Sequence, residues 1–172
     1  MSKSEDTINK KIEDIARLRK EEKYEEALQV CNEMIAEDNE CYAAYSKRSH
    51  ILHGLGKYSE ALRDLGRLIE LRPDGPTAYL QRAEWYLEQG DDKLAMDDLD
   101  FVIRTGEPYF IDTAYFYRAV ACLNLGHKAE AIDACLKLPD DFKYQIETPR
   151  WGGRLLSRDD IYRMANQGSE KG

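Results

Sequence analysis

A fixed step of 34 residues runs through most of this 172-residue chain and constrains its fold more than any other feature. Three alanines keep that step: Ala27, Ala61 and Ala95. Three turn positions keep it as well: Glu22, Gly56 and Gly90. A further copy carries Gly126 and Ala131, and two extra residues near Tyr109 lengthen its step to 36. A constant period of this length is typical of stacked structural repeats, in which each repeat packs only against its neighbours.

The copy from Tyr42 to Gly75 is the clearest of these repeats and predicts two helices joined by a turn at Gly56. Glycine suits the end of the first helix because a left-handed backbone turn costs it little. Pro73 ends the second helix, and Pro76 is well placed to open the next one. The same pattern predicts repeats at about residues 8–41, 42–75, 76–109 and 112–138.

The residues inside each copy resemble the tetratricopeptide motif, which places an aromatic residue, a large–small pair, a second aromatic, an alanine and a bulky residue at fixed positions. The second copy has Tyr45, Arg48-Ser49, Leu52, Ala61 and Leu65. The third has Tyr79, Arg82-Ala83, Tyr86, Ala95 and Leu99, and the fourth has Tyr115, Arg118-Ala119, Cys122, Ala131 and Cys135. The first copy departs from the motif because Lys11 stands where the first aromatic belongs.

This resemblance implies an all-α fold: a right-handed superhelical solenoid of about four helix-turn-helix repeats over residues 8–138, with a C-terminal capping segment. We expect residues 1–7 to be disordered, because they are polar and terminal. Residues 139–172 form a tail in which Ser157, followed by Asp159 and Asp160, predicts a short capping helix. The sequence shows no strand signal of consequence.

The tail has two interpretations. Ends of solenoids need a cap with a polar outer face, and the tail can supply one. Alternatively, Trp151 and the adjacent Gly152-Gly153 form an arm that reaches into the groove or contacts a partner.

The resemblance also implies that the first helices of the repeats line a concave groove that binds a peptide or a helix of a partner. Helical spacing gives the candidate groove residues as Ser46, His50, His53, Leu80, Glu84, Leu87, Phe116, Val120 and Asn124. Four of them are apolar and suit an amphipathic helix, although contact with the chain's own tail explains them equally well.

Chaperone-binding members of the family grip a carboxylate-bearing peptide with lysine, asparagine and arginine on these helices. Reading that clamp onto repeats two to four gives Ser46, His50, Gln81, Thr113 and Tyr117. Starting one repeat earlier gives Ile12, Ala16, Lys47, Thr77 and Gln81. Neither set restores the basic side chains that would offset desolvation of a carboxylate, so a clamp of this kind is not expected.

Three further sets of side chains have both a functional and a structural interpretation. His50 and His53 with Glu84 could hold zinc, or the two histidines could simply be solvated. Arginines recur in one position and could bind anions or pair with nearby acids: Arg48, Arg82 and Arg118. An acidic run could attract a cationic partner, or could flank a helix start and form a solvated outer face: Asp91, Asp92, Asp97, Asp98 and Asp100.

Composition and the absence of known motifs argue against several classes of function. A net charge of −8 argues against a nucleic-acid binder. No apolar run is long enough to span a bilayer, and the N-terminus lacks the apolar core of a leader peptide.

Cys31, Cys122 and Cys135 occupy core positions, which favours buried thiols in a reducing compartment; Cys41 is the fourth cysteine. No catalytic motif is present.

The sequence therefore predicts a non-enzymatic cytoplasmic adaptor that binds a protein segment in its groove, without cofactor or metal. The alternative is a structural or neutralising partner, such as a subunit, a chaperone or an antitoxin-like inhibitor, that binds through its outer face or its C-terminal arm.

Overall fold

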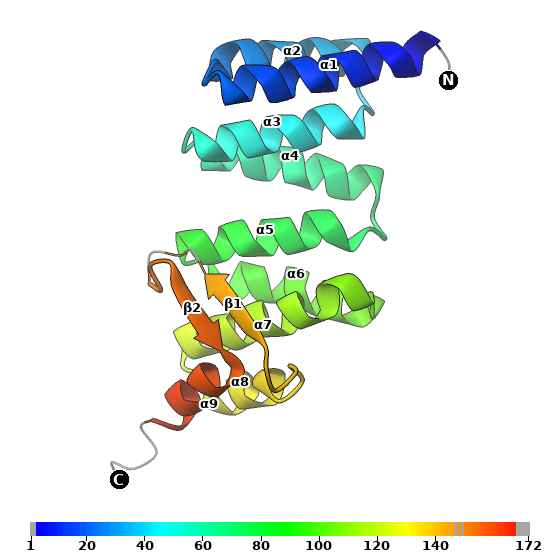
Figure 1. The fold of residues 1–172 in the computed structure, drawn as a ribbon. Coiled ribbons are helices and arrows are strands. Elements are labelled where there is room, and N and C mark those ends of the chain that lie inside the picture. The colour runs from blue at the N-terminus through cyan, green and yellow to red at the C-terminus, as the bar shows by residue number, and fades with distance from the viewer. Residues whose placement is uncertain (1–2, 147, 149, 168–172) are drawn as a thin grey trace. The chain divides into compact units, whose positions relative to one another are not determined.

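The computed structural model describes residues 3–146, 148 and 150–167, with side chains from residue 6 onward. The remaining residues, including 1–2 and 168–172 of the predicted terminal segments, lie outside the described part. The first helices of the repeats are α1 (Lys3–Lys20), α3 (Tyr42–Gly54), α5 (Pro76–Gln89) and α7 (Pro108–Leu125). The second helices are α2 (Tyr24–Glu37), α4 (Tyr58–Leu71), α6 (Asp92–Thr105) and α8 (Lys128–Cys135) (Figure 1). The predicted helical-repeat fold is confirmed. Helix α1 begins at Lys3, so the prediction of disorder through residue 7 is wrong from Lys3 onward.

The turn inside each repeat has the left-handed backbone that the repeated glycine predicts. Gly90, which ends α5, has a φ of 80°. Glu22 occupies the same slot in the first repeat and also has a positive φ, of 60°. A residue with a Cβ is strained in this conformation, so the backbone at Glu22 is strained, whereas glycine at the same position of the other repeats is not.

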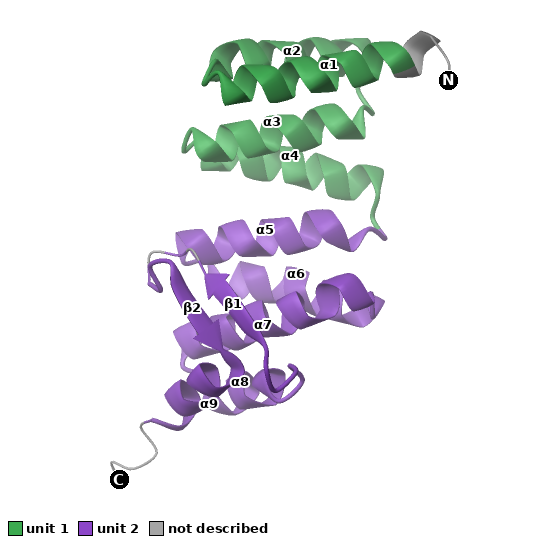
Figure 2. Ribbon diagram, viewed as in Figure 1, with its two compact units in different colours: residues 1–73 green, residues 74–172 purple. Residues whose placement is uncertain are grey.

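The chain divides into two compact units, residues 1–73 and residues 74–172 (Figure 2). In unit 1, α2 packs against both α1 and α3, and α3 packs against α4. Its core at the first repeat is small and apolar, with Ile15, Ala27 and Cys31 fully buried. Within the described residues no helix is both long and apolar enough to cross a membrane.

Unit 2 has the larger core, which is built from α5 to α8 together with the tail. Ala83, Ala95 and Ala119 are fully buried, as expected of small residues at close helix contacts. Large side chains from the tail join this core: Ile146, Trp151, Leu156 and Ile161.

The tail contains a β-hairpin that the sequence analysis did not predict. Strands β1 (Lys143–Ile146) and β2 (Arg154–Ser157) pair antiparallel, with Tyr144 opposite Leu156. The turn between them includes Gly152 and Gly153, both with positive φ. The expectation of no strands is therefore wrong: tertiary packing of Tyr144, Ile146 and Leu156 on the helices stabilises strands of only four residues.

The predicted capping helix is present as α9 (Arg158–Asn166), which packs against α8 and α7. Ser157 is its N-cap: the Ser157 hydroxyl accepts a hydrogen bond from the backbone N–H of Asp160, and the Asp160 carboxylate accepts one from the backbone N–H of Ser157. This reciprocal capping box fixes the start of the helix.

Candidate partner-binding site

Unit 1 presents the predicted groove residues of its repeats on the first helices. Helix α3 carries Ser46, His50 and His53 at helical spacing, with His50 exposed and the other two half-buried. The His50 Nδ1 atom lies 2.8 Å from the carbonyl oxygen of Ser46, and the His53 ring meets Tyr58 edge-on at 5.3 Å. Because α1 contacts α3, the exposed side chain of Arg19 on α1 belongs to the same pair of first helices. We call Arg19 of α1 together with Ser46, His50 and His53 of α3 the α1–α3 face.

Three of the predicted groove residues of unit 2 are buried and the other three are half-buried. Leu87 is 2% exposed, and Phe116 and Val120 are fully buried. The ring of Phe116 lies 5.6 Å from that of Phe142 and 5.1 Å from that of Tyr144, so the tail covers it. The prediction that these three side chains are available to a partner is wrong for this arrangement, because the chain's own tail and core enclose them. Leu80 is half-buried and packs against the same core.

The Glu84 carboxylate is hydrogen-bonded to other residues of unit 2. Its carboxylate accepts hydrogen bonds from the Gln81 amide and from the Tyr117 hydroxyl, both at 2.7 Å. The Tyr117 hydroxyl oxygen also lies 3.2 Å from the Tyr144 hydroxyl and can accept a hydrogen bond from it. Burial, with the nearby Glu84 carboxylate, raises the pKa of Tyr117 far above its ordinary value. Glu84 and Tyr117 thus help to hold the hairpin on the helices.

Asn124 and Trp151 belong to this enclosed region rather than to an open groove. The Asn124 side-chain amide donates to Asp92 at 2.7 Å, and the Arg150 guanidinium donates to the backbone carbonyl oxygen of Asn124 at 3.4 Å. Burial raises the pKa of Asp92. Trp151 is 9% exposed and packs in the core of unit 2. The structure combines the two interpretations of the tail: the tail packs on the last helices as a cap does, and it also covers the groove position Phe116. Only the idea that Trp151 contacts a partner disagrees with its burial.

The side chains considered for zinc do not assemble as one set. His50 and His53 are in unit 1, while the Glu84 carboxylate is occupied by partners in unit 2. Among the described residues, no three His, Cys, Asp or Glu side chains are grouped so as to hold a metal ion.

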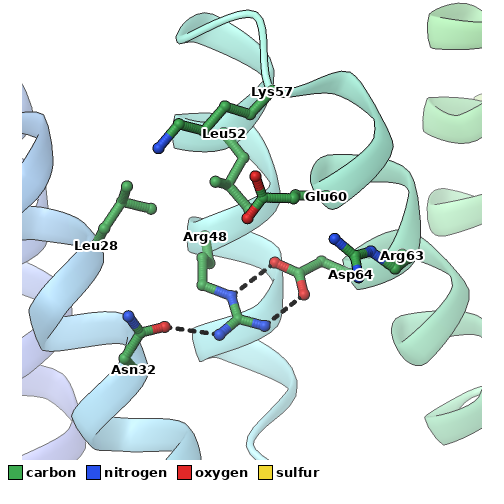
Figure 3. Close-up of a pocket in the computed structure, with 8 residues that line it drawn as sticks. All are labelled: Leu28, Asn32, Arg48, Leu52, Lys57, Glu60, Arg63 and Asp64. Carbon is green, nitrogen blue, oxygen red and sulfur yellow. Dashed lines mark hydrogen bonds and ion pairs between the residues drawn. The ribbon is translucent and has the colours of Figure 1, made fainter.

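A cavity of about 440 Å³ opens between α2, α3 and α4 of unit 1 (Figure 3). Arg48 lines it and donates two hydrogen bonds to Asp64, at 2.8 and 2.6 Å, and one to Asn32 at 2.7 Å. Three of the five guanidinium N–H groups therefore join α3 to α2 and α4. The other charged residues at the cavity are of both signs: Lys57, Glu60 and Arg63. This mixture gives no preference for an anion.

The other two repeated arginines also pair with acids. Arg82 donates two hydrogen bonds to Asp98, each of 2.7 Å, and Arg118 donates one to Asp100 at 2.8 Å. The structural interpretation of the arginines is the one the structure supports. Asp98 is only 4% exposed, so its assignment to a solvated acidic face is wrong.

Known proteins contain repeats similar to those of this chain. The family model described as "TPR repeat" covers residues 50–90. DnaJ homolog subfamily C member 3 of Gallus gallus is 35% identical over 80 residues, which is 46% of this chain and 16% of that protein. The tetratricopeptide repeat and J domain-containing co-chaperone DNJ1 of Cryptococcus neoformans var. grubii is 38% identical over 76 residues, 44% of this chain and 14% of that protein. The match thus spans less than a fifth of either relative's length.

Solved structures share the fold. MamA 41-end from Desulfovibrio magneticus RS-1 superposes with a TM-score of 0.66 at 21% identity, over 75% of this chain and 72% of that one. YrrB, whose structure is described as "a TPR protein with an unusual peptide-binding site", gives 0.62 at 17% identity, over 73% and 64%. Residues 50–90 therefore match the tetratricopeptide repeat, and the chain shares the fold of solved proteins that are built of such repeats.

Proposed function

We propose that this chain is a non-enzymatic protein–protein interaction adaptor, and that a peptide or helical segment of its partner binds on the α1–α3 face. The observation that carries the proposal is the contrast between the two units. The same repeat slots hold exposed His50 in unit 1 and buried Val120 in unit 2, where the tail covers the helices. The α1–α3 face is therefore the groove surface that a partner can reach without displacing the tail.

The chemistry of the α1–α3 face favours a polar segment over a purely apolar one. Ser46, His50 and His53 offer hydroxyl and imidazole groups, and Arg19 offers a guanidinium. Such groups form hydrogen bonds with the backbone carbonyls and polar side chains of a peptide. The description of YrrB as peptide-binding and the name of DNJ1 as a co-chaperone support a role in binding protein segments.

The test is capture of partners from a lysate of the source cells, identified by mass spectrometry, with matched variants. The double variant Arg19→Glu, His50→Glu introduces negative charge at two exposed positions of the α1–α3 face. Gln29→Glu combined with Arg63→Glu makes a similar change in charge on exposed positions of α2 and α4 and serves as the control. We expect the first variant to lose a specific set of proteins, with affinity reduced at least about tenfold, or 1.4 kcal/mol, and the control to keep them.

Loss of the same proteins in both variants, or in neither, contradicts binding on the α1–α3 face. Circular dichroism melts confirm that each variant is folded. Phe116→Glu is unsuitable for this purpose, because it buries a charge in the core of unit 2 and would unfold it.

A further inference from the structure

The start of α6 and the end of α7 are connected in unit 2 by one side-chain pair, Asp92 with Asn124. The Nδ2–H of Asn124 donates to a carboxyl oxygen of Asp92 at 2.7 Å. The other polar atom of the same amide, Asn124 Oδ1, is buried and has no hydrogen-bond partner among the described residues. A buried acceptor without a donor costs free energy, so this amide is only half satisfied.

The surroundings of Asp92 disfavour its charged form. Burial has the largest effect and raises the pKa of Asp92, and the neighbouring Asp91 carboxylate also raises it. The hydrogen bond from Asn124 and the positive charge of Arg150 lower this pKa, but the net change is upward. Asp92 therefore keeps its proton to a higher pH than an exposed aspartate does.

The elements packed around Asp92 face it with groups of different kinds. Uncharged Leu125 of α7 and Gly90 at the end of α5 line, together with Asp92, a cavity of about 240 Å³. Lys93 of α6 lines the same cavity and is exposed. The tail contributes Arg150, whose guanidinium donates to a backbone carbonyl oxygen in the last turn of α7 at 3.4 Å.

We infer that Asp92 and Asn124 form a proton-dependent joint between α6 and α7. With Asp92 protonated, its carboxyl O–H donates to Asn124 Oδ1, while the Nδ2–H of Asn124 still donates to the other carboxyl oxygen. Both polar atoms of the amide are bonded to one carbon, so a rotation about one side-chain bond of Asn124 brings Oδ1 to the acid. Uptake of one proton from solvent thus forms a second hydrogen bond and satisfies the buried oxygen.

The direction of the pH dependence follows from the raised pKa. An ionised Asp92 has acceptors alone, so Asn124 Oδ1 stays without a donor in that state. Because the folded pKa lies above the unfolded one, the stabilisation is complete below the ordinary carboxyl pKa of about 4 and is lost as pH rises through the folded pKa. The joint lies in unit 2 and acts independently of the α1–α3 face.

The test compares urea denaturation of the full chain and of Asp92→Asn between about pH 4 and pH 7. Trp85 and Trp151 are both in unit 2, so tryptophan fluorescence reports its unfolding. The amide at position 92 is neutral at every pH and offers the same donor and acceptor as the protonated acid. We expect an unfolding constant at least about fivefold smaller than that of the unchanged chain at neutral pH, and convergence of the two in acid. Asp97→Asn removes the same charge at an exposed position of α6 and is the matched control, with a change below about twofold.

Asn124→Ala separates the joint from the effect of burial alone. In that background Asp92→Asn should bring no gain, because the partner amide is missing. A gain that persists there would overturn the inference, since burial of the charge would then explain it. An Asp92→Asn variant that is no more stable than the unchanged chain at neutral pH would overturn it as well.

A second variant serves if Asn124→Ala does not fold. The exchanged pair, Asp92→Asn with Asn124→Asp, keeps one acid and one amide. In acid it should have the same unfolding constant as the unchanged chain within about twofold. A larger loss of stability would contradict the joint.

Discussion

At the scale of single residues, an arginine and an aspartate join the two helices of one repeat. Arg48 forms a bidentate hydrogen-bonded pair with Asp64 in unit 1, and Arg82 forms the same kind of pair with Asp98 in unit 2. Arg118 pairs with Asp100 instead, because Ala134 stands at the position that corresponds to Asp64 and Asp98. The sequence predicts that such an arginine meets an acid. Which acid it pairs with depends on whether the second helix of the same repeat has an aspartate at the position of Asp64 and Asp98.

The buried aspartate of this pair should contribute strongly to the stability of unit 2. Replacing Asp98 by Ala leaves Arg82 without its partner, and we expect unfolding free energy to fall by about 3 kcal/mol, as for other broken buried pairs. Asp97 is exposed, so Asp97→Ala should change stability by less than about 0.5 kcal/mol. Urea denaturation measures both variants, and equal losses would contradict the structural role of the pair.

The four cysteines should differ in reactivity although all are buried and unpaired. Burial raises the pKa of Cys31 and of Cys122 to about 11, which depletes the reactive thiolate. Cys41 is 8% exposed and borders a cavity between α1 and α2. We expect iodoacetamide to modify Cys41 first, at least about tenfold faster than Cys31 or Cys122, as followed by peptide mass spectrometry. Earlier modification of Cys31 or Cys122 would contradict the packing described for them.

At the scale of elements, the turns within the repeats show one exception to the glycine rule. Glu22 adopts the left-handed conformation that Gly56 and Gly90 adopt at the same step. Glu22→Gly should relieve this strain and raise the unfolding free energy by about 1 kcal/mol. The reverse change, Gly56→Glu, should lower it by a similar amount. Thermal and urea denaturation of the two variants test the pair, and a destabilised Glu22→Gly would show that the turn is not under strain.

The capping box of α9 should make stability depend on pH. Hydrogen bonds from Ser157 lower the pKa of Asp160, so the folded pKa lies below the unfolded one. The stabilisation is then complete above the ordinary carboxyl pKa of about 4, and it is lost as pH falls through the folded pKa. Ser157→Ala should cost about 1 kcal/mol at neutral pH and progressively less in acid. A cost that stays constant over the acid range would mean that the cap does not act through Asp160.

At the scale of the whole molecule, the sequence predicts the repeated helices well because each repeat encodes them locally. The turn glycines, the small alanines and the prolines each act within their own repeat. The hairpin escaped prediction because Tyr144 and Leu156 are stabilised by helices distant in sequence, and four-residue strands carry little pattern of their own. For the same reason the sequence predicts Phe116 in an open groove, because nothing local to α7 shows that the tail returns to cover it.

The contrast between the two units is also a consequence of where the tail packs. Of the groove positions, Leu87, Phe116 and Val120 are buried in unit 2, whereas His50 is exposed in unit 1. A repeat motif defines which side chains lie on the first helices. Burial of those side chains is decided by whichever segment packs on them next.

Photo-crosslinking tests the central claim, binding on the α1–α3 face, most directly. A benzoylphenylalanine at position 46 places the reactive group on the α1–α3 face, and one at exposed position 33 places it on α2 as the control. The account predicts that, in a lysate, a specific protein crosslinks at position 46 and not at position 33, through one contiguous segment identified by mass spectrometry. Crosslinking at position 33 alone, or equally at both positions, would contradict it.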